Sequence, residues 1–253
     1  MECVADAVQS VEAEHKRVVA AKDEVISRYE AELTDRGAPL DPQCRLPMRV
    51  RCDEEVTRAL MTERRGGGLA FFFWDFFRFR WYNNRDRDHQ LGDTVLRCHG
   101  DILRTCIRQN SHVFRFGGDE FLALAPDEDS LDAALAVASR IEDAIRTYPW
   151  IGTDHRLSDH LPQVNMGVLY IPIPAEVERL AMRDTPGLVD RLRHDLYKIL
   201  DLLMYGAKAD MERGESRVHS RIGHIVNGLI LDEQSKDLRQ QLEQQIGRER
   251  SEF

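Results

Sequence analysis

The chain has 253 residues, 42% apolar and 31% charged, so it is long enough to bury a substantial core without disulfide bonds. Its formal net charge of −9 argues against a surface for duplex nucleic acid, but leaves room for a basic pocket that holds one phosphorylated small molecule. Five scattered cysteines, no signal sequence and no uncharged apolar run of about 20 residues predict a reduced, cytoplasmic protein without a membrane partner.

The N-terminal segment, residues 1–35, contains neither glycine nor proline and predicts one long helix. Valine recurs every seven residues from Val4 to Val25, as in the seam of a parallel two-stranded coiled coil. The second seam position includes His15 and Lys22, which weaken such a seam. Dimerisation through this helix and packing of the helix on its own domain therefore both stay open.

Residues 36–65 predict a linker followed by a short helix, because three prolines and a glycine lie between residues 36 and 47. From residue 66 to residue 231, runs of strand length alternate with helical patterns. Strands are expected at 69–77, 113–115, 121–125, 162–174 and within 216–231, and helices at 53–64, 90–109, 129–148 and 186–211. This alternation predicts an α/β or α+β domain, and the polar tail 232–253 predicts a last helix.

Acidic residues would meet at one end of the predicted sheet if the predicted hairpin pairs beside the strand 69–77. Asp75 lies near the end of the apolar run 69–77, and Asp119 and Glu120 lie in the turn between two predicted strands. Core filling does not explain them, since an unpaired buried carboxylate is very costly. Three converging carboxylates would suit Mg²⁺ or Mn²⁺, which prefer hard oxygen ligands. A solvated acidic turn beside an unrelated strand end is the alternative that these residues alone leave open.

The turn reads Arg-Phe-Gly-Gly-Asp-Glu-Phe at residues 115–121, and Gly117 and Gly118 are expected to supply the positive φ angles of a tight hairpin. With Asp75 about forty residues upstream, it resembles the GGDEF domain of diguanylate cyclases over roughly residues 66–220. This resemblance implies a palm-like central sheet flanked by helices. It also implies an enzyme that condenses two GTP molecules into cyclic di-GMP and releases pyrophosphate.

The resemblance assigns the metal ligands. Asp75 and the carbonyl of Phe76 would bind Mg²⁺ or Mn²⁺ together with Asp119 and Glu120. Either Asp119 or Glu120 would assist deprotonation of the attacking ribose hydroxyl, and the sequence does not separate these two roles.

The resemblance also assigns contacts with the nucleotide base. Phe79 and Asn83 match the family motif D-x-D-x-F-K-x-x-N-D, and Asn83 would contact guanine. The family stretch G-H-x-x-G-D stands as Asp-His-Gln-Leu-Gly-Asp at 88–93, one residue further from Asn83 than usual, with His89 and Asp93 in register. Asp93 would accept hydrogen bonds from the guanine edge, which favours GTP over ATP. An N-cap for the following helix is the alternative role of Asp93.

Downstream, Lys208 falls in register with the lysine that would bind the β- and γ-phosphates. The family's next basic position holds Glu212 here, and Arg213 follows it. Arg108 matches the arginine of the family's inhibitory product site, R-x-x-D, but Ser111 replaces its acid. Weak or absent product inhibition is therefore expected.

One such domain binds one nucleotide, so the resemblance implies a homodimer in which two sites face each other. Two alternatives to an active diguanylate cyclase stay open. The first is a degenerate domain that binds a nucleotide or a protein partner without turnover, which the changes at Phe77, Asn84 and Glu212 favour. The second is a related nucleotide cyclase with a different base choice.

Overall fold

The computed structural model describes residues 40–62, 67–85, 89–107, 111–172, 187–212, 218–226 and 229–232. The predicted helix 1–35, nearly all of the predicted tail helix, and the predicted site residues Arg108 and Arg213 lie outside them. The helices are α2 (Arg49–Met61), α3 (Arg80–Arg85), α4 (Gln90–Cys106), α5 (Leu131–Thr147), α6 (Trp150–Thr153) and α8 (Leu188–Glu212), with a 3-10 helix, η1, at His155–Asp159. None of the described helices is long and apolar enough to span a membrane.

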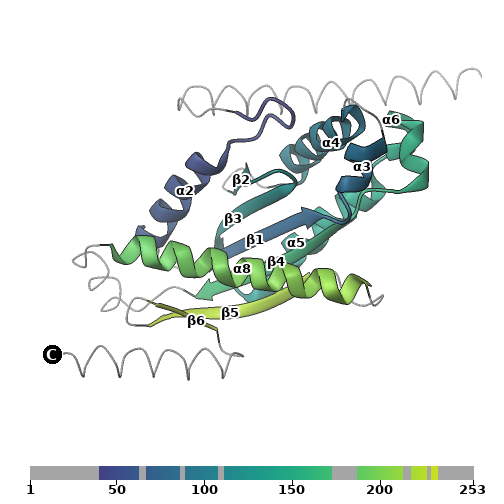
Figure 1. The fold of residues 1–253 in the computed structure, drawn as a ribbon. Coiled ribbons are helices and arrows are strands. Elements are labelled where there is room, and N and C mark those ends of the chain that lie inside the picture. The colour runs from purple at the N-terminus through teal and green to yellow at the C-terminus, as the bar shows by residue number, and fades with distance from the viewer. Residues whose placement is uncertain are drawn as a thin grey trace, which may run out of the picture.

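The described strands form one six-stranded sheet in the order β2-β3-β1-β4-β5-β6 (Figure 1). Their bounds are β1 Gly68–Phe76, β2 His112–Arg115, β3 Glu120–Glu128, β4 Val164–Pro172, β5 Val218–Val226 and β6 Leu229–Asp232. All neighbouring pairs are antiparallel except β4 and β5, which are parallel. The predicted hairpin is β2–β3, and its second strand pairs with β1. The predicted convergence of Asp75 with the acidic turn is therefore confirmed at the level of the backbone.

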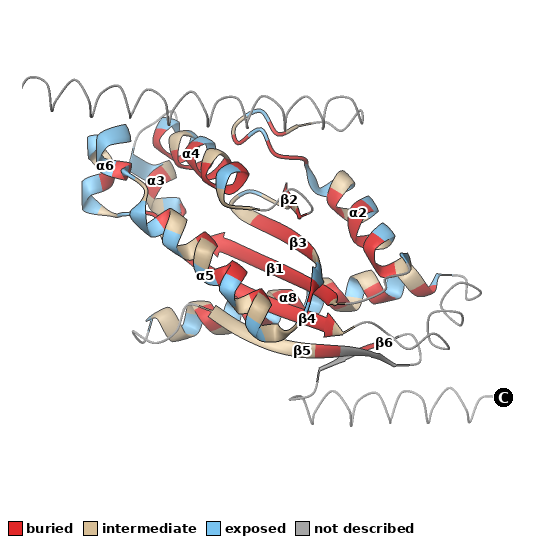
Figure 2. Cartoon of the chain, turned by 180° about the vertical axis from the view of Figure 1, so that it is seen from behind, coloured by how far each residue is buried: buried red, intermediate tan, exposed pale blue. Residues whose placement is uncertain are grey.

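Both faces of the sheet are covered, which explains why β1 is apolar along its whole length (Figure 2). Leu69, Phe71 and Phe73 pack with α2 and α8 on one face. On the other face, Phe72 and Trp74 pack with α4 and α5. Each fully buried phenylalanine contributes about 1.5–3 kcal/mol, so β1 supplies a large share of the apolar stabilisation.

The predicted strands and the four helices predicted between residues 53 and 211 are present, with bounds shifted by a few residues. The one or two helices predicted at 186–211 correspond to the single helix α8, and the last strand predicted within 216–231 corresponds to two strands, β5 and β6. The short helix begins at Arg49, four residues before the predicted start. Its N-cap, Met48, makes no side-chain cap hydrogen bond, so the sequence carries no usual start signal there. The six-residue α3 was not predicted, because it is too short to show a helical repeat of apolar residues.

Helix α8 packs directly on β4 at Gly167. A Cβ atom at this glycine would lie 2.7 Å from the carbonyl oxygen of Leu200 and 2.7 Å from Cβ of Leu203. The backbone of α8 therefore sits closer to the sheet than any side chain at residue 167 allows. This close approach sets the position of every α8 side chain that faces the end of β1.

Substituting Gly167→Ala is expected to lower the free energy of unfolding by about 1–3 kcal/mol, since the added methyl overpacks the contact between α8 and β4. Urea denaturation followed by circular dichroism measures this loss. Gly152→Ala is the matched control, because no atom lies within 4 Å of a Cβ at that helical glycine. Equal denaturation midpoints for the two variants would show that α8 moves aside freely.

Candidate active site

Asp75 lies one residue before the end of β1 and is only 6% exposed. Its Cα is paired with that of Glu120 on β3 and with that of Asn165 on β4. The amide of Asn165 donates a hydrogen bond to Oδ1 of Asp75 at 3.0 Å, and Nζ of Lys208 donates to Oδ2 at 2.8 Å. Both oxygens of this buried carboxylate are therefore compensated, one by a dipole and one by a charge.

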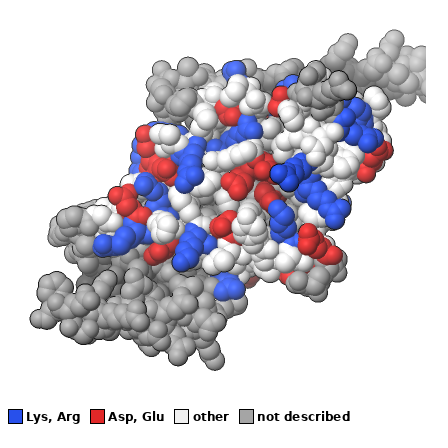
Figure 3. Space-filling model, in the orientation of Figure 1, with Lys and Arg blue, Asp and Glu red and all other residues white. Residues whose placement is uncertain are grey.

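Further carboxylates raise one another's pKa values around Asp75. Burial raises the pKa of Asp119, and the charge of Asp75 adds to the effect. Burial also raises the pKa of Glu120, with further contributions from Asp119, Asp201 and Asp75. Figure 3 shows carboxylate side chains gathered near the middle of the face that α8 crosses, with lysine and arginine side chains around them. Lys208 supplies part of the positive charge that this group requires.

The two glycines of the turn do not have the predicted role. Neither Gly117 nor Gly118 has a positive φ angle; among the described glycines, only Gly67 and Gly187 do. A Cβ at Gly117 would lie 2.6 Å from Oε2 of Glu120, whereas a Cβ at Gly118 would meet nothing within 4 Å. A side chain at residue 117 would therefore displace the Glu120 carboxylate from its place against the backbone of the turn.

Arg115 anchors the turn, a role that the sequence did not indicate. Its Nε and Nη2 atoms donate hydrogen bonds to the carbonyl of Gly118 at 3.0 and 2.7 Å. Its Nη1 atom donates to Asp41 at 2.7 Å and to Gln43 at 2.8 Å. One guanidinium thus connects the acidic turn to the segment that precedes α2, and its five fixed donors suit this branched contact.

The residues predicted to contact the base gather where α3 meets α4. A Cβ at Gly92 would lie 2.1 Å from Oδ1 of Asn83, and Nδ1 of His89 lies 2.8 Å from the carbonyl oxygen of Asn83. Asp93 is exposed in the first turn of α4, whose N-cap is His89, so the alternative role of Asp93 as an N-cap is wrong. Phe79 is 9% exposed and packs in the core, and its contact with substrate stays a prediction.

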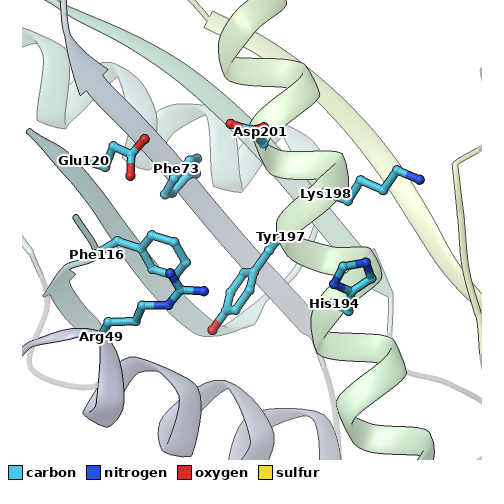
Figure 4. A pocket seen from close by; sticks show the side chains of 8 residues that line it. All are labelled: Arg49, Phe73, Phe116, Glu120, His194, Tyr197, Lys198 and Asp201. Atoms are coloured by element: carbon cyan, nitrogen blue, oxygen red, sulfur yellow. The ribbon is translucent and has the colours of Figure 1, made fainter. Parts of the chain in front are cut away.

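A cavity of about 310 Å³ lies between α2 and α8, beside the acidic turn (Figure 4). The residues that line it are Arg49, Phe73, Phe116, Glu120, His194, Tyr197, Lys198 and Asp201. Glu120 and Asp201 lie toward one end, on either side of Phe73, and the guanidinium of Arg49 lies 4.4 Å from the ring centre of Phe116. The acidic group is therefore open to solvent-sized molecules from the side between α2 and α8.

The family model for the diguanylate cyclase GGDEF domain matches residues 38–183. The chain belongs to the GGDEF family. The diguanylate cyclase TpbB of Pseudomonas aeruginosa strain UCBPP-PA14 is 31% identical over 226 residues, which cover 86% of this chain and 46% of that protein. The diguanylate cyclase DgcP of P. aeruginosa is 30% identical over 159 residues, or 57% of this chain and 23% of that protein. This chain thus spans less than half the length of both curated relatives.

A solved structure of the isolated GGDEF domain of TpbB (YfiN) from P. aeruginosa superposes with a TM-score of 0.53 at 30% identity. The superposition covers 73% of this chain and 94% of that domain. The mixed sheet flanked by helices is therefore the palm-like fold of the GGDEF family, as the sequence predicted.

The donor set of this GGDEF domain suits a small, hard divalent cation. Asp75, Asp119 and Glu120 offer carboxylate oxygens at neighbouring positions of β1, the turn and β3. Burial, and after it the charges of neighbouring carboxylates, raises the pKa values of Asp119 and Glu120, and a bound cation would oppose both effects. Among the described residues, however, no three His, Cys, Asp or Glu side chains form a group that could hold a metal ion. The metal ligands therefore remain predictions.

Lys208 contacts Asp75 in this structure. Burial opposes the charge of Lys208, but the hydrogen bond and charge of Asp75 outweigh this effect and raise the pKa of the ammonium group. The predicted binding of phosphate by Lys208 stays untested. Phe76 points its ring into the core, so the atom available for the predicted metal contact is its carbonyl oxygen.

Substituting Asp201→Asn is expected to raise the melting temperature of the metal-free protein at pH 7. Burial and the charge of Asp75 raise the pKa of Asp201 above its ordinary value of 3.8, so folding disfavours the ionised carboxylate. The gain should shrink as the pH falls through the raised pKa and vanish below 3.8, where the carboxyl is protonated in both the folded and unfolded states. Calorimetry across this range in the presence of a chelator measures the difference. A variant that melts lower than the wild type at pH 7 would contradict this electrostatic account.

Proposed function

We propose that this chain is a metal-dependent diguanylate cyclase that condenses two GTP molecules into cyclic di-GMP with release of pyrophosphate. The observation that carries the proposal is the placement of Asp75 beside Glu120, with Lys208 in contact with Asp75. Membership of the GGDEF family and the names of the relatives TpbB and DgcP support it.

The reaction is attack of a ribose 3′-oxygen on the α-phosphorus of a second GTP. A new P–O bond forms, the bond to pyrophosphate breaks, and the hydroxyl proton passes to a base. Asp119 and Glu120 are the candidate bases, since a raised pKa makes a carboxylate a better proton acceptor near neutral pH. Lys208 would bind the phosphates as a point charge. A bound Mg²⁺ or Mn²⁺ would supply charge neutralisation at the reacting phosphate, with Asp75, Asp119, Glu120 and the Phe76 carbonyl as its ligands.

Selection of guanine is assigned to the junction of α3 and α4. The N1–H and N2–H₂ groups of guanine are adjacent donors, and the exposed carboxylate of Asp93 is a matching acceptor. Asn83 lies against Gly92 and would contact the same base, and Nδ1 of His89 lies 2.8 Å from the carbonyl oxygen of Asn83. Adenine lacks these donors and would leave Asp93 without a partner.

The second candidate is a domain that binds a nucleotide or a protein partner without turnover. Both oxygens of Asp75 already have partners within the chain, Asn165 and Lys208. Among the described residues, no preformed group of three metal-ligating side chains accompanies them. A domain in which the Lys208 contact keeps a cation away from Asp75 would bind without catalysing.

Incubation of the purified protein with Mg²⁺ or Mn²⁺ and GTP, ATP or both, followed by mass spectrometry, tests the proposal. We expect cyclic di-GMP and pyrophosphate from GTP and no cyclic product from ATP. Asp119→Asn should lower kcat by at least about 100-fold, because it removes a charged group at the reacting centre. Asp143→Asn, an exposed change on α5, is the control and should keep normal activity. Binding of GTP without product would favour the second candidate, and full activity of Asp119→Asn would overturn the assignment.

A homodimer is part of the proposal, because each domain would hold one GTP and two sites must face each other. We expect the activity per molecule to rise with protein concentration until the dimer is saturated. Enzyme assays over a dilution series, combined with light scattering at the same concentrations, measure both quantities. Constant activity per molecule from a protein that scatters as a monomer would refute the dimer.

A further inference from the structure

His99 lies on α4 and is completely buried behind the end of β1. Its Nε2 atom accepts a hydrogen bond from the indole nitrogen of Trp74 at 3.0 Å. Because Nε2 is the acceptor, the proton of the neutral ring is on Nδ1. Burial lowers the pKa of His99 to about 3, so the ring keeps this neutral form near pH 7.

The imidazole is enclosed by aromatic rings that belong to the two strand ends. Its centroid lies 4.7 Å from that of Phe76 and 4.6 Å from that of Phe121, both in edge-on contact. Trp74 stacks on Phe121 at 5.9 Å, and these two residues are register partners across β1 and β3. His99 therefore contacts β1 and β3 at the same point.

These three aromatic residues are direct chain neighbours of the candidate catalytic acids. Trp74 and Phe76 flank Asp75, and Phe121 follows Glu120. Successive side chains of a strand point to opposite faces of the sheet. A ring fixed on the α4 face thus determines the direction of the adjacent acid on the α8 face.

Apolar packing alone does not explain a histidine at this place. A buried indole N–H requires an acceptor, which an aliphatic side chain at residue 99 does not provide. Nδ1 of His99 has no hydrogen-bond partner within the described part of the chain. Burying this N–H group without a partner costs folding free energy, which an apolar side chain at residue 99 would avoid. The same helix begins beside Asn83 and carries Asp93 in its first turn, at the predicted base site.

We propose that His99 is a positioning residue that orients Asp75 and Glu120 from the back of the sheet through its hydrogen bond to Trp74 and its contacts with Phe76 and Phe121. The inference rests on the proposed function for its effect on catalysis. The effect of His99 on how firmly the ends of β1 and β3 are held does not depend on that function.

The test compares His99→Leu, which removes the acceptor, with His99→Gln, which keeps one. For His99→Leu we expect kcat with GTP to fall about 10- to 100-fold and KM to change less than about threefold, since misplacement of reacting groups affects the chemical step. His99→Gln should recover most of the lost kcat. All assays are run below the melting temperature of each variant, so that only folded protein is compared.

The double variant Trp74→Phe/His99→Leu separates positioning from stability. It removes the donor and the acceptor together, so its melting temperature should exceed that of His99→Leu. Its kcat should stay low, because the hydrogen bond that orients the strand end is still missing. If kcat instead follows the melting temperature through all the variants, His99 is only a structural residue and the proposal is wrong.

Amide hydrogen exchange provides a readout that needs no activity, and it applies even if the wild type forms no cyclic di-GMP. For His99→Leu we expect faster exchange at residues 74–76 and 119–121, and little change at the opposite ends of β1 and β3. His99→Gln should exchange like the wild type. Unchanged exchange at both strand ends would overturn the proposal whatever the enzymatic result.

Discussion

A carboxylate buried at the end of the central strand is the constraint on which the rest of this structure depends. Asp75 is held between β3 and β4, where an ionised group is tolerated only with close compensation. Lys208 provides that compensation, and it reaches Asp75 because α8 lies directly on β4 at Gly167. The glycine, the lysine and the acid are therefore parts of one arrangement, although they lie far apart in the sequence.

The acidic turn is fixed from a second direction. Arg115 binds the carbonyl of Gly118 inside the turn and the side chain of Asp41 outside it. The backbone nitrogen of Arg115 also donates to the carbonyl of Pro47 at 2.9 Å. The turn is thus a rigid part of the fold, anchored on the segment that leads into α2. Its acids are consequently held close together, although burial, and after it the charge of Asp119, raises the pKa of Glu120.

The sequence predicted the strands from local patterns, and it predicted the meeting of Asp75 with the acidic turn on the condition that the hairpin pairs beside the Asp75 strand, which β3 does. Apolar runs and the spacing of a hairpin can be recognised in a single sequence. The alternation of side chains along paired strands then places Asp75 and Glu120 on one face of the sheet. The roles of Arg115 and Asn165 were not predictable in this way. Each depends on a partner that only the folded chain brings near, and neither residue type is distinctive for such a contact. The predicted positive φ angles of Gly117 and Gly118 are wrong, because a glycine pair in a turn looks the same in sequence whether or not its backbone takes a positive φ.

Two departures from the family motif, Phe77 and Asn84, lie just before and within α3, after the end of β1. The ring of Phe77, which replaces an acid, lies near His160 at 6.2 Å and under the guanidinium of Arg78 at 4.8 Å. Its backbone nitrogen donates to the carbonyl of Gln163, so the residue belongs to the packing between α3 and the loop after η1. Asn84, a second replacement, is exposed on α3, and Glu212, the third, is the last residue of α8. These changes leave the carboxylates that surround Asp75 in place, so they alone are weak evidence for a degenerate site. The distinction between catalysis and binding depends instead on whether the Lys208 contact keeps a cation away from Asp75.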